Sequence, residues 1–156
     1  NGWSKTYAMT GWRLGYSIWP EALIGHVERL AVNCHSCVNA PTQFAGIAAL
    51  TGPQDAVDAM VKAFDARRRV IVDGLNALPG VRCAEPGGAF YAFPNIEGTG
   101  MDAKTLQTRL LEEAGVAVVA GPSFGALGEG FVRFSYAASM EQIEDALTRI
   151  ERLLTA

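Results

Sequence analysis

Residues 1–16, which read NGWSKTYAMTGWRLGY, contain the most specific pattern of this chain. They place Lys5 directly after a hydroxyl, Ser4, and an arginine, Arg13, follows eight positions later. A lysine amine can bond to an aldehyde when its surroundings disfavour the ammonium form. A guanidinium can hold a phosphate dianion through parallel hydrogen bonds, and a hydroxyl can donate one more. The spacing alone also fits a solvated lysine and a surface arginine with an ion-pair partner.

The composition indicates a soluble globular protein. The chain has 156 residues, which fits one domain or parts of two, and 49% of them are hydrophobic while 19% are charged. The net charge is −3, and no run of Lys and Arg is long enough for a basic patch, so we expect neither nucleic acid nor a membrane as partner. No apolar stretch approaches the roughly 20 residues that span a bilayer. The first residues lack a signal peptide and an initiating Met, so we expect a piece of a longer polypeptide.

The cysteines favour a reducing compartment, the cytoplasm. Their number is odd and no secretory signal accompanies them, which argues against a disulfide framework. Cys34 and Cys37 form a C-x-x-C pair, but a structural zinc site needs four ligands, and only Cys83, His26 and His35 are left as scattered candidates. We therefore expect no metal, and we interpret the cysteines as small buried or half-buried thiols.

The first half of the chain predicts one strand and three helices. Leu14 to Trp19 is a short apolar run that Pro20 stops, which is typical of a strand. Apolar residues at helical spacing predict helices over residues 22–32 and 42–50. The same spacing continues from Pro53 to Leu78, and a helix of about 25 residues is longer than usual, so we expect it to connect two domains.

From residue 81 the pattern changes to β-β-α-β-β-α, which describes a small α+β domain with helices on one side of a sheet. The expected strands are Val81–Ala84, Ala89–Phe93, Val116–Val119 and Phe131–Ser135. Asp102 is expected to cap a helix over residues 103–113. Ser139 and Gln142 form a capping box before a final helix, whose inner face is formed by Ile143, Leu147, Ile150 and Leu154.

Residues 2–15 resemble the cofactor-attachment signature of class I and II aminotransferases, which are pyridoxal-phosphate enzymes of fold-type I. Ten positions of the signature are filled, by Gly2, Trp3, Ser4, Lys5, Ala8, Met9, Gly11, Arg13, Leu14 and Gly15. Only Trp3 is bulkier than the residue usual at its place. The resemblance implies an α/β fold: residues 1–52 would end the large cofactor-binding domain, residues 53–79 would form the interdomain helix, and residues 80–156 the small C-terminal α+β domain.

The resemblance also implies roles for three residues of this segment. Lys5 would bind pyridoxal 5'-phosphate covalently and later act as the catalytic general base. Ser4 and Arg13 would hold the cofactor phosphate. A base of this kind works best when its surroundings lower its pKa toward neutrality.

A fourth implied role falls on Arg133. This residue follows a loop of the type Gly-x-x-Phe-Gly, at residues 121–125, and would bind the α-carboxylate of the substrate. An arginine in an otherwise apolar strand needs a carboxylate partner, and a bidentate one suits it best. The alternative is an exposed Arg133 that pairs with Glu129 or Glu141. The stretch Gly87–Tyr91 resembles a family element that lines the substrate pocket.

The activity implied by the resemblance is amino transfer between an α-amino acid and a 2-oxo acid, in a homodimeric parent. The family's other cofactor contacts lie upstream of the lysine, so we expect this chain by itself to bind the cofactor poorly and to be inactive. One subgroup takes a second cation for dicarboxylic substrates from the region after the lysine. No Arg or Lys lies between Val32 and Val61, which favours neutral or aromatic amino acids.

Two alternatives stay open at this point. Lyases and synthases of the same cofactor class share this fold and a similar signature, because fold and cofactor site do not fix the reaction. A non-catalytic remnant that serves as an interaction module is the second alternative. The missing upstream half, and the apolar faces that it would leave on the Leu14 strand and the Thr42 helix, would support it.

Overall fold

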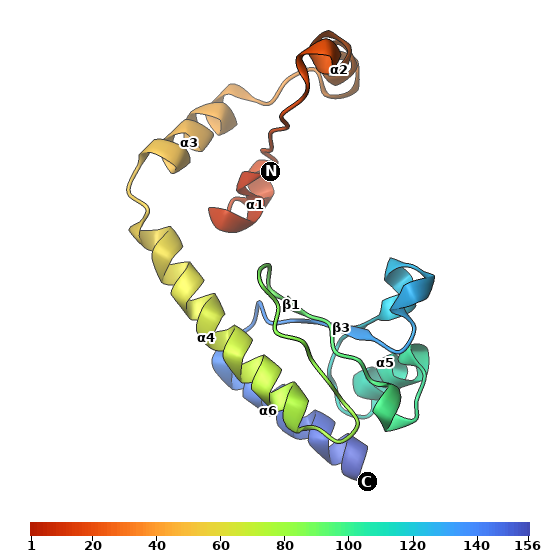
Figure 1. Cartoon of the computed structure of the whole chain (residues 1–156). Helices are drawn as coiled ribbons and strands as arrows, with labels where there is room; N and C mark the ends of the chain where they lie inside the picture. Colours follow the sequence, from red (N-terminus) through yellow and green to blue (C-terminus); the bar gives the residue numbers. More distant parts are fainter. The chain divides into compact units, whose positions relative to one another are not determined.

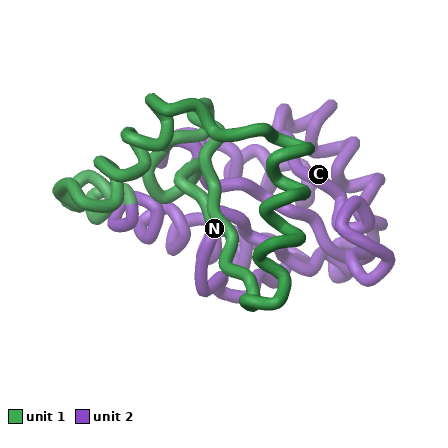
Figure 2. The backbone as a smooth tube through the Cα atoms, turned by 90° about the horizontal axis from the view of Figure 1, so that it is seen from above, with its two compact units in different colours: residues 1–60 green, residues 61–156 purple.

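The structure, a computed structural model, describes all 156 residues, and its regular elements are helices and one small sheet (Figure 1). The chain divides into two compact units, Asn1–Met60 and Val61–Ala156 (Figure 2). The longest helix, α4 (Asp55–Ala77), is continuous across this boundary. The domain limits at residues 52 and 79 stay a prediction. None of the helices has the length and apolar character that crossing a membrane would require.

The first unit is built from helices. The short helix α1 (Trp3–Thr6) and the 3-10 turn η1 (Thr10–Trp12) precede α2 (Glu21–His35) and α3 (Ala40–Thr51). The two helices predicted from apolar spacing over residues 22–32 and 42–50 are thereby confirmed. The Asn39 side chain caps α3, since its Oδ1 accepts the N–H of Thr42 at 3.0 Å.

The strand predicted over Leu14 to Trp19 is wrong. The Trp3 N–H donates to the Leu14 carbonyl at 3.2 Å, and the Tyr16 N–H donates to the Asn1 carbonyl at 2.8 Å, around a single bridge between residues 2 and 15. A strand exists only through pairing with a neighbour. Residues 17–19 have no such backbone partner in this chain, so no ladder forms beyond the single bridge.

The second unit contains an antiparallel sheet of three short strands. The central strand is β3 (Val132–Ser135), which lies between β1 (Tyr91–Ala92) and β2 (Val119–Ala120). Tyr91 lies opposite Ser135, and Val119 lies opposite Arg133. Alternate side chains of a strand point to opposite faces, so Arg133 shares its face with Ser135 and Tyr91.

The other face of the sheet is the core. Val132 is fully buried and Phe134 nearly so, and both belong to the cluster that the helices form. Helices α4, α5 (Ala103–Glu112) and α6 (Met140–Thr155) contribute their buried residues to this one cluster. Of these helices, α4 and α6 run side by side (Figure 1). The prediction that helices cover one side of a sheet is confirmed. The core residues from the helices include Ile71, Leu75, Leu106, Leu110, Ile143 and Ile150.

Helix caps in this unit form as the sequence predicts. Asp102 accepts the N–H of Thr105 at 2.8 Å. Ser139 accepts the N–H of Gln142 at 3.2 Å while the Gln142 side chain accepts the Ser139 N–H at 3.2 Å, which is a complete capping box.

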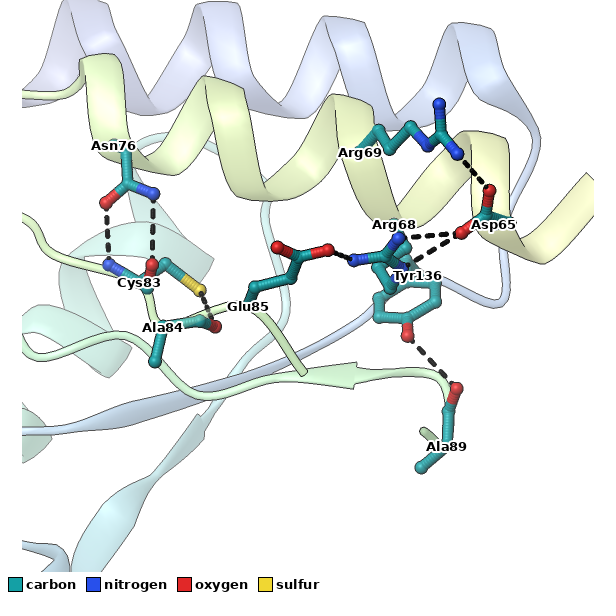
Figure 3. A network of polar contacts seen from close by, with 9 residues as sticks. All are labelled: Asp65, Arg68, Arg69, Asn76, Cys83, Ala84, Glu85, Ala89 and Tyr136. Atoms are coloured by element: carbon teal, nitrogen blue, oxygen red, sulfur yellow. Dashed lines mark hydrogen bonds and ion pairs between the residues drawn. The ribbon is translucent and has the colours of Figure 1, made fainter. Parts of the chain in front are cut away.

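The strand predicted over Val81 to Ala84 shrinks to one bridge between Arg82 and Asn95. Asn76 of α4 donates from Nδ2 to the Cys83 carbonyl at 3.0 Å, and its Oδ1 accepts the Cys83 N–H at 2.8 Å (Figure 3). These two bonds satisfy the backbone groups of Cys83, which point away from the bridge between Arg82 and Asn95.

Candidate functional site

Ser4 and Lys5 lie on α1, a helix of only four residues. The Tyr7 N–H donates to the Trp3 carbonyl at 3.2 Å, and the Ala8 N–H donates to the Lys5 carbonyl at 3.2 Å, which closes the turn. The Ser4 side chain is half-buried and the Lys5 side chain is exposed. The amine and the hydroxyl are therefore presented by adjacent residues of one tight turn.

Trp3, the loosest fit to the signature, anchors this turn. Its indole N–H donates to the carbonyl of Gly46 on α3 at 3.1 Å, and its ring meets that of Tyr16 edge-on at 5.4 Å. The glycine at position 46 leaves room for Leu14, because a Cβ built there would lie 2.5 Å from the Leu14 Cδ2. The bulky Trp3 thus takes the place of no reactive side chain, and it fixes α1 against α3.

Arg13 follows η1 in the left-handed region, with φ +54°, and Ala8 has φ +53°. Such backbone costs about 1–3 kcal/mol for residues other than glycine and is concentrated at functional sites. The guanidinium donates one hydrogen bond within the chain, from Nη1 to the Thr10 carbonyl at 3.0 Å. A guanidinium has five N–H donors, so Arg13 retains donors for an anion.

Arg13 also borders an open pocket of the first unit. The volume of this pocket is about 930 Å³, and it lies between the segment after α1 and the loop that joins α2 to α3. Neither Ser4 nor Lys5 lines it. The lining residues are Ala8, Gly11, Trp12, Arg13, His35, Cys37, Val38, Asn39 and Thr42.

Arg133 belongs to the second unit, where two aromatic rings hold it. Its guanidinium carbon lies 4.3 Å from the centre of the Tyr91 ring and 4.6 Å from the centre of the Phe124 ring. Tyr91 reaches it as the diagonal neighbour on the same face of the sheet. Phe124 reaches it from the 3-10 turn η3 (Gly121–Phe124), which directly follows β2.

No carboxylate of the chain pairs with the guanidinium of Arg133, which also makes no hydrogen bond. Pairing with Glu129 or Glu141 is therefore not what the structure contains. Glu129 is engaged elsewhere, since its Oε1 accepts the N–H groups of Ala103 at 2.9 Å and Gly130 at 3.1 Å. Sequence reasoning identified the arginine and missed its aromatic surroundings, although both rings belong to stretches that it had singled out.

Tyr136 fixes the Gly87–Tyr91 stretch through a hydrogen bond. This tyrosine is 1% exposed, and its hydroxyl donates to the Ala89 carbonyl at 3.0 Å (Figure 3). Ala89 has φ +60°, so the bond holds a residue in an unfavourable conformation directly before β1. Burial raises the pKa of the Tyr136 hydroxyl, which keeps it a donor.

The cysteines differ from the interpretation made from the sequence. Cys34 and Cys37 are exposed free thiols, whereas only Cys83 is buried. Cys34 lies in the last turn of α2 and Cys37 in the loop behind it, where this chain places no core. Burial raises the pKa of the Cys83 thiol. No group of three or more His, Cys, Asp or Glu side chains is arranged to hold a metal ion.

Comparison with known proteins gives one consistent result. The family model described as aminotransferase class I and II matches residues 1–150. An aspartate aminotransferase of Pyrococcus horikoshii is 45% identical over 99% of this chain. An aromatic-amino-acid aminotransferase of Thermococcus litoralis is 40% identical over 99% of the chain. The chain spans about 40% of the length of each of these relatives.

Solved structures agree with the sequence relatives. An aromatic aminotransferase from Pyrococcus horikoshii matches with a TM-score of 0.95 and 42% identity, covering 99% of this chain and 42% of that one. An aspartate aminotransferase from Rhizobium meliloti matches with a TM-score of 0.92 and 39% identity, covering 99% of this chain and 41% of that one.

Proposed function

The chain belongs to the aminotransferase class I and II family, and on this premise we propose that the protein containing it moves an amino group between an α-amino acid and a 2-oxo acid. The observation that carries the proposal is the filled signature around Lys5, because it joins the family match to a specific amine. Amino transfer is preferred to lyase or synthase chemistry, since the relatives compared above are named as aminotransferases.

We assign pyridoxal 5'-phosphate as the cofactor, and the side chains present fit it. They offer an exposed amine at Lys5, a neighbouring hydroxyl at Ser4, and a guanidinium at Arg13 with donors left for a phosphate. When bound, the cofactor supplies an aldehyde for amine exchange and a ring that withdraws electrons from the substrate Cα. Lys5 would hold it covalently, and Ser4 and Arg13 would bind its phosphate.

The chain's own groups then have separate tasks. Once the substrate amine has displaced it from the cofactor, the freed Lys5 amine would act as the base that takes the proton from the substrate Cα and delivers it to the cofactor carbon. Arg133 would bind the α-carboxylate through two parallel N–H donors and so fix the position of Cα. Binding the carboxylate in this way orients the substrate before the proton moves.

We also propose a homodimeric cytoplasmic enzyme acting on neutral or aromatic amino acids. The cysteine usage supports the compartment, and the lack of Arg and Lys between Val32 and Val61 supports the substrate class. Light scattering of the full-length protein tests the dimer. Comparing kcat/KM for phenylalanine and aspartate tests the substrate class, and a preference for aspartate would contradict it.

The decisive experiment combines turnover with labelling. The full-length protein that contains this chain is incubated with pyridoxal phosphate, reduced with borohydride and digested, and each labelled lysine is mapped. We expect label on Lys5 but not on Lys62 or Lys104, and amino transfer that depends on added 2-oxo acid. Lys5→Ala should abolish both, while Lys104→Ala serves as the matched control and should change neither.

Different failures of this experiment mean different things. Label spread evenly over the lysines would contradict the assignment of Lys5. Product formation without a 2-oxo acid would indicate a lyase instead of an aminotransferase. The 156-residue chain alone is expected to show no measurable turnover, and robust amino transfer by it would contradict the expected need for upstream residues.

A further inference from the structure

We propose that Tyr91 and Phe124 are positioning residues that hold the guanidinium of Arg133 by its faces and leave its N–H edge for a substrate carboxylate. The inference rests on the proposed function, because it takes Arg133 to be the carboxylate-binding residue. It adds what fixes that arginine in place before any substrate arrives. The contacts within the second unit carry it.

A guanidinium has two kinds of binding surface. Its N–H donors point outward in the plane of the group, whereas its flat faces stack on aromatic rings. The two rings, at 4.3 and 4.6 Å, provide no in-plane acceptor for these donors. Because the guanidinium of Arg133 also lacks any hydrogen bond or ion pair in the chain, its bidentate edge stays available.

The strand geometry explains why Tyr91 lies there. Tyr91 is directly opposite Ser135, and Arg133 is two residues from Ser135 on the same face of β3. Long and aromatic side chains reach such diagonal neighbours across two antiparallel strands. Tyr136 fixes the turn just before β1, through its bond to the Ala89 carbonyl at 3.0 Å.

Phe124 is held in place by neighbouring aromatic rings and by the turn to which it belongs. Its ring packs edge-on against Phe93 at 6.0 Å, and Phe93 stacks on Phe131 at 5.3 Å with an angle of 5° between the planes. The turn that carries Phe124 is fixed by a close backbone approach, since a Cβ at Gly121 would lie 1.9 Å from the Gly128 carbonyl oxygen. Half of the Phe124 side chain remains exposed, so the ring covers the arginine without burying it.

The test uses the complete 156-residue chain with labelled arginine, so it needs neither cofactor nor turnover. The Nε–H resonance of Arg133 is assigned by its loss in Arg133→Lys. Propionate is titrated as the monocarboxylate probe and propionamide as the uncharged control. In the unaltered chain, we expect the resonance to be shifted by the two rings and to move saturably with propionate only.

The variants separate positioning from general stability. Tyr91→Leu and Phe124→Leu should each weaken propionate binding about 10-fold, in line with the cost of misplacing a binding group. Tyr91→Phe and Phe124→Tyr retain a ring and should bind propionate as the unaltered chain does. Leu127→Ala alters a side chain of the same loop that is 98% exposed, and it is the matched control.

The outcomes are distinct. If both leucine variants bind propionate as tightly as the unaltered chain, the positioning role is wrong while the proposed function stands. If propionate has no effect on Arg133 in the unaltered chain although the ring shift is present, the carboxylate role itself fails, and the proposed function loses that residue. Weakened binding in the leucine variants, with rescue by the aromatic ones, supports the inference.

Discussion

Arg68 shows how a single charged residue joins distant parts of the second unit. Its side chain is 19% exposed and donates to Asp65 Oδ1 at 2.7 Å, one turn away on α4. It also pairs with Glu85, which belongs to the turn before β1 (Figure 3). The hydrogen bond from Arg68 lowers the pKa of the Asp65 carboxyl below its usual value. The same pairing raises the pKa of Arg68, so the guanidinium stays charged.

Acid sensitivity follows from this pair. The pKa of Asp65 is lower in the folded chain than the value of about 3.9 in the unfolded chain, so the pair stabilises the fold above that value. The stabilisation is lost as the pH falls through the folded pKa. We expect the urea midpoint to fall as the pH drops below the ordinary carboxyl pKa of about 3.9, and Asp65→Asn to flatten that fall.

The acid experiment has a matched control on the same helix. Asp73→Asn changes an exposed acid of the same helix and should leave the pH dependence as it is. Asp102 and Glu113 also have lowered pKa values, through the Thr105 N–H and Arg109 respectively, so some acid sensitivity persists in every variant. An Asp65→Asn profile identical to that of the unaltered chain would contradict the role given to the pair.

Among the elements, α4 and α6 depend on a glycine for their close packing. A Cβ built at Gly74 of α4 would lie 2.3 Å from Leu147 Cδ1 and 3.1 Å from its Cγ. Leu147 packs on the core, so it cannot turn away without loss of contacts. The close packing of α6 against α4 therefore requires a residue without a side chain at position 74.

Gly74→Ala should destabilise the second unit. Alanine improves helix propensity by about 1 kcal/mol relative to glycine. Overpacking a core costs about 1–3 kcal/mol, and the balance is a loss of about 1 kcal/mol in the free energy of unfolding. Urea denaturation followed by circular dichroism measures it.

Two further variants check the reason. Adding Leu147→Ala to Gly74→Ala should cost less than the sum of the two single changes, because the clash is gone. Gly25→Ala alters a helical glycine where an added Cβ would meet no neighbour within 4 Å, so it should not destabilise. Strict additivity of the double variant would show that the two residues do not clash.

At the scale of the whole molecule, the two units differ in how much they bury. The buried hydrophobic cluster runs from Ile71 to Ile150, entirely within the second unit. In the first unit, α2 has no buried residue, and Met9 is the only buried hydrophobic side chain of the unit. Exposed apolar side chains of this unit include Ile18, Leu30, Val32, Phe44 and Ile47.

Hydrogen exchange should therefore be uneven along the chain. Segments with few buried apolar contacts open locally at low free energy, whereas core segments open only with the global transition. We expect the amides of α2 to exchange much faster than those of β3, α5 and α6. Exchange of the 156-residue chain, followed by mass spectrometry of peptides, measures this. Equal protection of α2 and α6 would contradict it.

The sequence by itself determined the helices, the helix caps and the signature, because these depend on residues that lie close together along the chain. Helices α2, α4 and α6 are predicted by apolar positions three and four residues apart, and α5 by its cap at Asp102. The capping box at Ser139 is likewise contained within one turn. The signature around Lys5 is local in the same way. Such features depend on neighbours along the chain, so reading the chain suffices to find them.

The tertiary structure alone decided which distant groups meet. Asn76 satisfies both backbone groups of Cys83 from another element, and the run at Leu14 finds too few partners to become a strand. Arg133 meets aromatic rings instead of a carboxylate because the register of β1 against β3 brings Tyr91 to it. Register and close approach are set by packing between segments far apart in sequence, and no local pattern contains them.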